Sequence, residues 1–476
     1  HRDLHSFPTR RSSDLYQVVL VEKNSYVGGR VAQLHQYFPK LCPPYCGLEI
    51  NFRRVKSNPR ITIHTLAEVT GIEGAPGDFT VKVKVSPRYV NDKCTACGKC
   101  AEAVSATIPN PFNYGLDQIK AAYLPHDLAM PLRYVIDPSI AGSDEGKKAA
   151  EACPYGAVDL GDQGQELSLN VGAVVWAAGW TPYDPSKIEY YNFDKSPNVV
   201  TNVQFERLAA SNGPTAGVIQ RPGDGAAPKK VAFIQCAGSR DENHLPFCSS
   251  ICCLASLKQS TYVMEKLPEA EITIYFIDIR AMDRNEDFYS KVKASNKVQF
   301  VKSKIAMITP QADGNLILEG ENTATGERFK AEHDLVVLAT GMQPNTALSQ
   351  VPFDVTYDPY GFLTSGQAII GVGTVRRPSE VVTCVQDGTS AALKAIQAVG
   401  REEIMSKKVC GYLCKGCGIG DALDLGGLKK AAGEQGVKEF KEHDVLCSPE
   451  GVAMIQADVD AGTNALLIAA CSSRAK

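Results

Sequence analysis

The sequence predicts an α/β fold with two Rossmann-like dinucleotide-binding domains and an inserted module that is rich in cysteine. The first observation is a set of apolar segments, near residues 16–22, 172–179 and 334–341, that end in an acid or in small residues. Buried parallel strands have this character where they meet a dinucleotide. The second observation is that many of the 16 cysteines form groups spaced like cluster ligands. A chain of 476 residues is long enough for two or more such domains.

The first 15 residues are excluded from this fold. HRDLHSFPTRRSSDL has no hydrophobic periodicity and resembles translated sequencing-adapter sequence, with a disordered basic tail as the alternative. We therefore expect the true N-terminus of the protein to be missing. The glycine-rich turn that should lie about 20 residues before the end of the next strand is absent, as that expectation requires.

The first dinucleotide unit is predicted from the strand that ends at Glu22. An acid at the end of the second strand of a doubly wound fold binds ribose hydroxyls. Lys23 follows, and Gly28 and Gly29 would let the backbone approach a pyrophosphate that Arg30 could neutralise. The alternative is a solvated glutamate after an edge strand.

Three later segments predict that the dinucleotide is a flavin, FAD. Strands ending near residues 178–179 and 340–341 would allow close backbone contact, although each could be an ordinary buried strand with a glycine turn. A strand at 381–385 is predicted to lead into an Ala-rich helix that opens at 387–388 and faces the flavin or its phosphates. The expected cofactor-binding residues are Glu22, Lys23, Gly28, Gly29, Arg30, Ala178, Gly179, Thr340, Gly341, Asp387 and Gly388.

A ferredoxin-like insertion is predicted between the first two strand segments. Cys94, Cys97 and Cys100 form C-x2-C-x2-C, and Cys153 follows after 52 intervening residues, directly before a proline. Three close cysteines and a distant Cys-Pro bind one [4Fe–4S] cluster in bacterial ferredoxins. Zinc is the alternative metal. The irregular segment 108–115 is expected to cover the cluster.

The densest cysteine group, C-x11-C-x3-CC, consists of Cys236, Cys248, Cys252 and Cys253. Four thiols within 18 residues suit a metal cluster, with buried small hydrophobes as the alternative. A helix is predicted over 249–260, so Cys248 and Cys252 would share a face and Cys253 would lie about 100° further round. One cubane bound by all four would then need local unwinding.

The second Rossmann unit lacks the features of a nicotinamide site. Its first strand, at 229–235, opens into Cys236 and not into a glycine-rich turn. Because a nicotinamide dinucleotide places its pyrophosphate on that turn, we expect neither NADH nor NADPH to reduce the flavin directly. The next strand does end in an acid, Asp278. The cysteine group replaces the phosphate turn, so its cluster is expected close to the flavin.

Cys42 and Cys46 lie just after the predicted ribose-binding turn. They are cluster ligands, a redox pair near the flavin, or plain loop residues, and the sequence leaves these alternatives open. Cysteine in a chain without an export signal indicates redox or metal chemistry in a reducing cytoplasm.

The C-x11-C-x3-CC motif, followed by Ile-Asp278-Ile-Arg280, resembles the A subunit of heterodisulfide reductase. The Cys42–Cys46 segment, the single-cluster insertion and 386–388 look closer to the A subunit of the quinone-interacting membrane-bound oxidoreductase of sulfate reducers. The resemblance covers roughly 16–404. It implies FAD, iron–sulfur clusters and electron transfer without nicotinamide.

The C-terminal segment resembles a different unit, the start of the B subunit of the quinone-interacting complex and of heterodisulfide reductase A proteins. Met405 looks like a start codon that is read through, which implies either a fusion or a stop lost in assembly. Scattered core cysteines are the alternative to a further cluster. The candidate ligands are Cys414, Cys417, Cys447 and Cys471.

The resemblance implies a protein that links membrane quinol to adenylylsulfate reductase in a cytoplasmic subcomplex, held at the membrane by a quinone-reactive partner. The alternatives are a non-catalytic cluster-bearing scaffold and the electron-bifurcating A subunit of a heterodisulfide reductase. A net charge of −3 gives no reason to expect nucleic acid. The absence of an apolar run of about 20 residues argues against direct membrane insertion.

The motifs divide the chain into predicted domains. These are 1–15, a sequencing artefact; 16–85, the FAD-binding domain; 86–165, the [4Fe–4S] insertion; 166–225, the FAD-binding domain continued; 226–330, the second Rossmann-like domain; 331–404, the C-terminal part of the FAD-binding domain; and 405–476, the start of a second unit.

Overall fold

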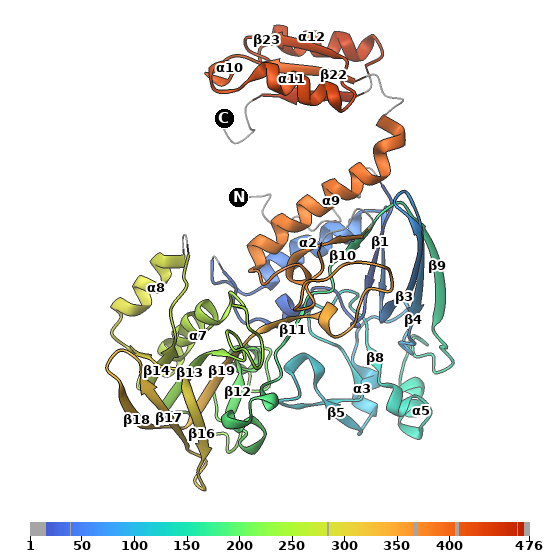
Figure 1. Cartoon of the computed structure of the whole chain (residues 1–476). Helices are drawn as coiled ribbons and strands as arrows, with labels where there is room; N and C mark the ends of the chain where they lie inside the picture. The colour runs from blue at the N-terminus through green and yellow to red at the C-terminus, as the bar shows by residue number, and fades with distance from the viewer. Residues whose placement is uncertain are drawn as a thin grey trace. The chain divides into compact units, whose positions relative to one another are not determined.

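The computed structural model shows a chain of two units, divided between Ala395 and Ile396 (Figure 1). The N-terminal segment that was predicted to be an artefact lies outside the described residues. The described residues are 16–38, 40–282, 285–364, 369–404, 409–463 and 465–470.

The predicted first dinucleotide unit begins with a parallel strand pair. Strand β1 (Val18–Glu22) pairs in parallel with β2 (Ile61–Thr65), and the 3-10 helix η1 (Gly29–Gln33) and helix α2 (Tyr45–Ser57) lie between them in sequence. Parallel strands need such a crossover connection. A second parallel pair consists of β10 (Val174–Trp176) and β21 (Ile369–Gly371).

A three-stranded antiparallel sheet carries the insertion. It consists of β3 (Ala67–Ala75), β4 (Asp78–Val85) and β9 (Gln165–Val171), in that order. Val85 and Gln165 are paired across β4 and β9. The intervening residues therefore leave the sheet and return to it at one point, as an inserted module does.

The insertion folds around its own small core. Val90 and Val158 form an antiparallel bridge that closes its base. Small and branched side chains, Val104, Ala121 and Ile136 among them, are buried there. Its elements are α3 (Lys99–Ala103), β5 (Thr107–Pro109), η2 (Pro111–Asn113), β6 (Gln118–Lys120), β7 (Ala122–Tyr123), β8 (Val135–Ile136), α4 (Pro138–Ala141) and α5 (Asp144–Glu151).

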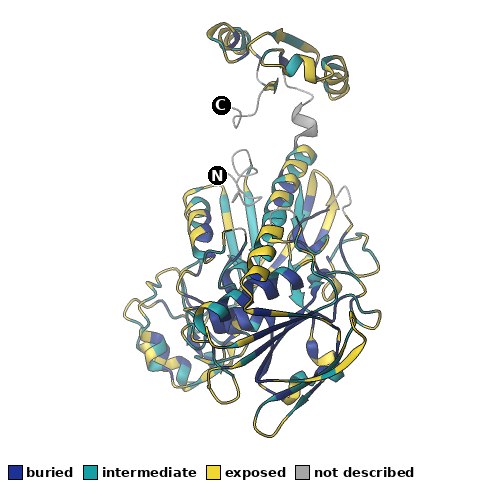
Figure 2. Ribbon diagram, turned by 90° about the vertical axis from the view of Figure 1, so that its left-hand side faces the viewer, coloured by how far each residue is buried: buried dark blue, intermediate teal, exposed yellow. Residues whose placement is uncertain are grey.

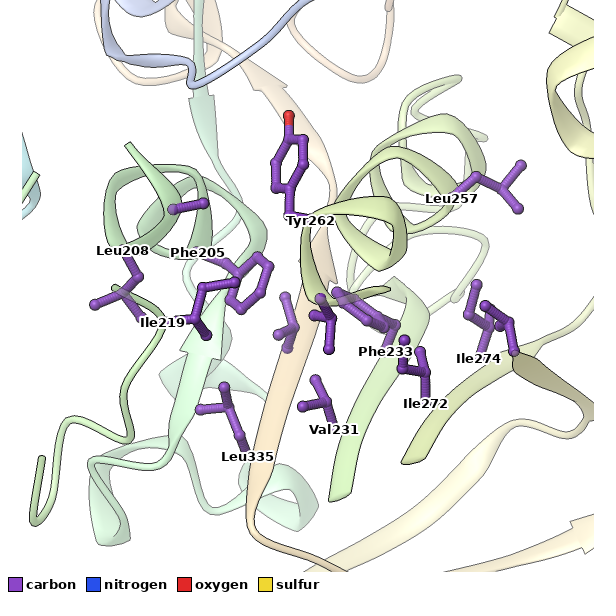
Figure 3. Packing of buried hydrophobic residues seen from close by; sticks show 14 of the residues in the cluster. Phe205, Leu208, Ile219, Val231, Phe233, Leu257, Tyr262, Ile272, Ile274 and Leu335 are labelled. Atoms are coloured by element: carbon purple, nitrogen blue, oxygen red, sulfur yellow. The ribbon is translucent and has the colours of Figure 1, made fainter. Parts of the chain in front are cut away.

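A five-stranded parallel sheet forms the second domain, in the order β12-β19-β13-β14-β15. Its near-continuous apolar strands are typical of parallel sheets that are covered on both faces. Figure 3 shows Phe205 and Leu208 packed with Val231, Phe233 and Leu335 in the core. Buried residues concentrate along these strands and along α7 (Figure 2). The strands are β12 (Val199–Thr201), β13 (Lys230–Ala237), β14 (Glu271–Phe276), β15 (Val298–Lys302) and β19 (Leu335–Thr340).

The helices of this domain are α6 (Asn202–Ala209), α7 (Cys252–Lys266) and α8 (Asn285–Ala294). An antiparallel sheet completes the domain with β16 (Ile305–Pro310), β17 (Leu316–Asn322) and β18 (Glu327–His333).

The position of β19 differs from the predicted domain division. The sequence grouped 331–404 with the FAD-binding domain, but β19 lies between β12 and β13 in the second sheet. β12 also lies in this sheet, although 166–225 was assigned to the first domain. The sequence of an apolar strand does not reveal which sheet the strand joins, because long-range packing decides its neighbouring strands. The two domains are connected by an antiparallel pair, β11 (Trp180–Pro182) with β20 (Met342–Pro344).

The predicted strand at 381–385 is wrong. Those residues begin helix α9 (Val381–Ile404), so Asp387 and Gly388 lie inside a helix and do not open one. The β-branched run Val-Val-Thr favours a strand by local propensity. The amphipathic spacing of the following residues, with Ala391 and Ala395 packed on Ile370 and Val372, overrides it.

The second unit is a small parallel α/β fold. Strand β22 (Val409–Cys414) lies between β23 (Glu439–His443) and β24 (Ala465–Ala469). Its helices are α10 (Ile419–Ala422), α11 (Leu425–Glu434) and α12 (Pro449–Asp460). Met405 and Cys471, singled out above, lie outside the described residues. In the part of the chain that the structure describes, no helix has the length and apolar character needed to cross a bilayer.

Candidate functional site

Four cysteines of the insertion line one pocket. Cys94, Cys97, Cys100 and Cys153 all face it, and Tyr134 is also in its lining. The lining is almost wholly apolar apart from the sulfur atoms, which restricts water. The structure therefore brings together a ligand set whose members are up to 59 residues apart in sequence.

Local backbone features place these thiols. Gly98 has φ of 85°, which only glycine adopts readily, and it turns the chain so that α3 begins at Lys99 and presents Cys100 in its first turn. Cys153 follows the end of α5. The backbone of Asn91 donates to the carbonyl oxygen of Ala157 at 2.8 Å, so the two cysteine loops are held at the same base.

Hydrogen bonds and burial give these thiols different acidities. Burial alone would raise the pKa of Cys153, but backbone N–H groups, led by Ala157 at 3.2 Å from Sγ, outweigh it and lower the pKa. Burial and the nearby Cys94 raise the pKa of Cys100 to about 11. The amide of Ala96 donates to Cys94 Sγ at 3.4 Å. A bound iron ion supplies the charge that deprotonates such thiols.

Four thiols in one pocket are a complete ligand set for either predicted metal. Zinc in a tetrahedral site takes four sulfur atoms at about 2.3 Å. A [4Fe–4S] cubane also takes four thiolates. The choice of a cluster over zinc stays a prediction from the ligand spacing.

The second cysteine group is also brought together. Cys236 is the last residue but one of β13 and has φ of 57°, and Cys252 begins α7; both are buried against Ala339. A hydrogen bond from Cys252 is the largest cause of the lowered pKa of Cys236, and the same bond raises the pKa of Cys252. Within the pair, Cys236 is therefore the more acidic thiol.

The predicted helix start at 249 is wrong. Helix α7 begins at Cys252, so Cys248 lies in the preceding loop and shares no helix face with it. Ser249 holds this loop, because its hydroxyl bonds Ser239 at 2.7 Å and accepts from the Met342 amide at 2.9 Å. Cys248 is therefore not fixed on the face of α7 that carries Cys252. The local unwinding that one cubane bound by all four thiols was expected to need is present in this loop.

Two polar features lie next to this site, a backbone donor to Cys253 and a buried amide without a partner. Burial raises the pKa of Cys253 to about 11, and the amide of Arg280 donates to its Sγ at 3.4 Å. Gln235, directly before Cys236 in β13, is buried with both side-chain polar atoms unpartnered. A buried amide without a partner is costly unless a further group completes its hydrogen bonds.

The first dinucleotide unit keeps the expected backbone. Glu22 ends β1, burial raises its pKa, and its carboxylate accepts from the Asn24 amide at 2.8 Å. Gly28 and Gly29 both have positive φ, and a Cβ on Gly29 would meet nothing within 4 Å. The Gly-Gly turn therefore offers the close backbone approach that a pyrophosphate needs. Lys23 is exposed and pairs with Glu68 at 2.5 Å.

The guanidinium of Arg30 donates hydrogen bonds to acceptors within the protein. Its Nε donates to the carbonyl oxygen of Trp180 at 2.6 Å, and its other nitrogens donate to Tyr114 and Thr181. The side chain thereby fixes the turn of η1 to β11. Neutralisation of a pyrophosphate by Arg30 stays a prediction.

The two later strand ends meet each other. Gly179, with φ of 78°, accepts from the Asn345 amide at 3.1 Å, and Gly341 accepts from the Tyr183 amide at 2.8 Å. Ala178 accepts from the side chain of Asn345 at 2.6 Å. The buried Thr340 donates to Asn202, and a Cβ on Gly341 would lie 2.4 Å from Ser239 Oγ, so both belong to the second domain.

Asp387 has a structural partner that the sequence did not reveal. Its carboxylate accepts from the Gly373 amide and from Arg376, both at 2.7 Å. It thus anchors the 3-10 turn η7 (Gly373–Val375) after β21 to the side of α9, where Gly388 is buried. A flavin-facing helix N-terminus at these positions is not present.

The segment 108–115 was expected to cover the cluster, and it covers the dinucleotide unit instead. Phe112 packs edge-on to Tyr26 and stacks on His126 at 4.8 Å, and Tyr114 donates to Gln33 at 2.8 Å. Sequence inspection gave no sign of this, because the contacts with Tyr26 and Gln33 join residues more than 80 positions apart.

Buried charges that sequence inspection missed hold the same region. Lys258 and Glu206 form an ion pair of 3.0 Å with side chains only 6% and 3% exposed. Glu206 also accepts from the His35 amide at 2.9 Å, and Lys258 donates to the carbonyl oxygen of Gln36 at 2.6 Å. The helix that begins with Cys252 is therefore tied to the turn after η1.

Cys42 and Cys46 lie beside the same unit. The backbone of Cys42 forms an antiparallel β-bridge with that of Tyr37, and Cys46 is exposed in the first turn of α2. The backbone amide of Tyr37 donates to the carbonyl oxygen of Cys42 at 3.2 Å, and burial is the main cause of the raised pKa of Tyr37. The choice between their three predicted roles stays open.

The cysteines of the second unit share one edge of its sheet. Cys414 ends β22, Cys417 follows with φ of 55°, and Cys447 lies in the loop after β23. The carboxyl ends of parallel strands meet at one edge, so the predicted ligands fall there. Cys471, the fourth, lies outside the described residues.

Curated relatives carry one family name. The chain is 35% identical over 424 residues to the second iron-sulfur A subunit of the CoB–CoM heterodisulfide reductase of Methanopyrus kandleri, covering 85% of this chain and 64% of the relative. It is 34% identical over 424 residues to the A subunit of the ferredoxin/F420H2-dependent CoB–CoM heterodisulfide reductase of Methanosarcina acetivorans, covering 84% and 53%. The chain thus spans between about half and two thirds of these relatives.

A further relative is the A subunit of the H2:CoB–CoM heterodisulfide, ferredoxin reductase of Methanothermobacter marburgensis, at 31% identity over 426 residues, covering 85% of this chain and 64% of the relative. No protein-family model matches. Thioredoxin reductase from T. acidophilum superposes with a TM-score of 0.45 at 15% identity, over 83% of this chain and 95% of that one. By sequence, the chain is a heterodisulfide reductase A-like protein.

Proposed function

We propose that this chain is an electron-transfer subunit of a heterodisulfide-reductase-type complex, with FAD and [4Fe–4S] clusters as cofactors. The observation that carries the proposal is the pocket of the insertion, where Cys94, Cys97, Cys100 and Cys153 converge. Thiolates in this number suit a cubane cluster. The relative from Methanopyrus kandleri is named an iron-sulfur subunit of such a reductase, which supports the proposal.

The chain's own groups would bind, orient and insulate these cofactors. FAD supplies one- or two-electron chemistry and the clusters one-electron chemistry when bound. The amides of Ala96 and Ala157 donate to thiolate sulfur and stabilise its charge. The Gly28-Gly29 turn would admit the pyrophosphate, and the buried contacts of Arg207 would keep the insertion at a constant distance from the dinucleotide unit.

The test is anaerobic reconstitution of the full chain followed by iron, sulfide and flavin analysis. Bound flavin together with about four irons for each cluster site is the expected result. Iron without flavin would favour the alternative of a non-catalytic cluster-bearing scaffold. Neither iron nor flavin after reconstitution would overturn the proposal.

A finer candidate is the quinone-linked electron-transfer complex of sulfate reducers. The observation that favours it is that the insertion contains a single set of four cysteines between residues 86 and 165. Its partners would be adenylylsulfate reductase and a membrane protein that reacts with quinone, and the chain would sit at the cytoplasmic face of the membrane through them. The relatives named above favour the heterodisulfide alternative.

An assay with the electron donor and acceptor of each candidate complex distinguishes the two candidates. The complex purified with its native partners should either oxidise a quinol and pass electrons to adenylylsulfate reductase, or reduce the CoB–CoM heterodisulfide. Quinol oxidation without heterodisulfide reduction supports the quinone-linked candidate, and the reverse result rejects it.

A further inference from the structure

Two arginines and one aspartate form a charged group at the thiols of the second cysteine site. Arg240 lies in the loop between Cys236 and Cys248, and Arg280 follows β14. The carboxylate of Asp278 accepts from Arg240 through one oxygen and from Arg280, at 3.4 Å, through the other. One carboxylate therefore binds both guanidinium groups.

Both arginines stand on segments that contain or contact the thiols. The backbone amide of Arg280 donates to Cys253 Sγ at 3.4 Å, and the same thiol donates to the carbonyl oxygen of Asp278 at 3.6 Å. Arg240 follows Cys236 by four residues in the chain. The segment of Asp278 and Arg280 therefore touches the thiol site directly, and Arg240 belongs to the loop that joins two of its cysteines.

The backbone is strained where it places Arg240. Its φ of 57° is left-handed, a conformation that is strained for a non-glycine residue. Its amide donates to the carbonyl oxygen of Phe247 at 3.1 Å, and Leu245 donates to Gly238 at 2.8 Å, so a tight loop imposes this conformation. The loop directs the guanidinium toward Asp278 and leaves its side chain 25% exposed. Partial burial reduces the screening of its charge by water.

We propose that Arg240 and Arg280 raise the reduction potential of a cluster bound by Cys236, Cys248, Cys252 and Cys253. One electron added to a four-thiolate [4Fe–4S] cluster changes its net charge from −2 to −3, and nearby cations favour the more negative state. The charged group contributes two positive charges and one negative charge, a net charge of +1 beside the thiols. This inference rests on the proposed function, because it requires a cluster at this site.

Charge variants of the full chain, reconstituted anaerobically and titrated with EPR detection, test the proposal. Arg240→Gln and Arg280→Gln should each lower the midpoint potential of this cluster, and Asp278→Asn should raise it. Arg280→Lys keeps the charge and should stay near the wild-type value. The matched control is Arg328→Gln, which removes the same charge from an exposed side chain in β18.

Opposite signs for the arginine and aspartate variants separate a charge effect from a packing effect, because loosened packing would move both in one direction. Unchanged midpoints in both arginine variants, or a lowered midpoint in Asp278→Asn, would overturn the inference. If an arginine variant assembles no cluster, the sign in Asp278→Asn decides. A wild-type chain that holds no iron at Cys236 would instead count against the proposed function at this site.

Discussion

Arg207 and Asn113 lie 94 residues apart in sequence, and Nε of Arg207 donates to Oδ1 of Asn113 at 2.8 Å. The same guanidinium donates to the carbonyl oxygen of Gln33 at 3.1 Å and to Asn212 at 2.7 Å. It also stacks over Phe112, 4.6 Å from the ring centroid. One fully buried side chain therefore joins the insertion, the dinucleotide unit and the second domain.

Replacement of Arg207 should weaken all three connections. Arg207→Met keeps much of the apolar volume but leaves Asn113, Asn212 and the carbonyl oxygen of Gln33 without a donor. Loss of hydrogen bonds to a buried charge predicts a fall of about 3 kcal/mol in the free energy of unfolding. Urea denaturation measures it, with Arg328→Met, at a 90% exposed side chain, as the control near zero. Equal free energies of unfolding in the two variants would show that the contacts of Arg207 do not stabilise the protein.

Cys97→Ser should remove close to one cluster's iron, about four atoms, and leave the flavin bound. The pocket lies in an insertion with its own core, so the dinucleotide fold need not collapse. Iron and flavin analysis after anaerobic reconstitution checks this. Cys384→Ser changes a thiol in α9 to which no cluster is assigned, and it is the comparison. An iron content equal to wild type in Cys97→Ser would contradict the assignment of this cluster.

Cys252→Ser and Cys253→Ser should abolish electron transfer through the chain while the Cys94 cluster remains. Both thiols are buried at the start of α7 beside Cys236. Turnover with the native donor and acceptor, combined with EPR of the insertion cluster, gives the answer. Full turnover in both variants would make these thiols packing residues.

Neither NADH nor NADPH should reduce the flavin directly. Asp278, which stands where a Rossmann domain binds ribose, is occupied by Arg240 and Arg280, and Cys236 replaces the phosphate turn. Stopped-flow absorbance of the purified chain mixed with each nucleotide checks this. Rapid bleaching of the flavin by either one contradicts it.

Stability should rise with pH between about 4 and 6.5. Burial lowers the pKa of His126 and His333 to about 4, so the folded protein binds fewer protons than the unfolded chain in this window. Each histidine then contributes up to about 1.4 kcal/mol per pH unit, and the contribution is lost as pH falls toward 4. His126→Phe should reduce the slope of the free energy of unfolding against pH by the contribution of one histidine. Urea denaturation at several pH values measures this slope. An unchanged slope would refute a neutral, buried His126.

Local sequence was sufficient for some features of the fold. Strand β1 ends at Glu22 as expected, because a short apolar run that ends in an acid and Gly-Gly allows few other conformations. The paired ends of β4 and β9 at Val85 and Gln165 lie where the predicted insertion begins and ends. Ligand spacing predicted three of the four thiols that line the insertion pocket, since C-x2-C-x2-C brings its members together locally, while Cys153 reaches the pocket through the fold. Binding of a cluster by these thiols stays a prediction.

Other features depend on contacts between distant residues. The start of α7 at Cys252 depends on Ser249, whose hydroxyl is held by Ser239 and Met342, so helix propensity alone placed the start too early. Helix α9 replaced a predicted strand because its alanines pack on β21 and the loop after it.

The sequence by itself determined the chemistry of this protein, because thiol spacing and glycine turns are local and follow from residue type. Only the tertiary structure decided which sheet β19 joins, that 108–115 covers the dinucleotide unit, and that Arg207 and the pair of Arg240 and Arg280 stand where they do. The physical reason is that a buried charge is stable only where distant acceptors surround it, and those acceptors are assembled by folding.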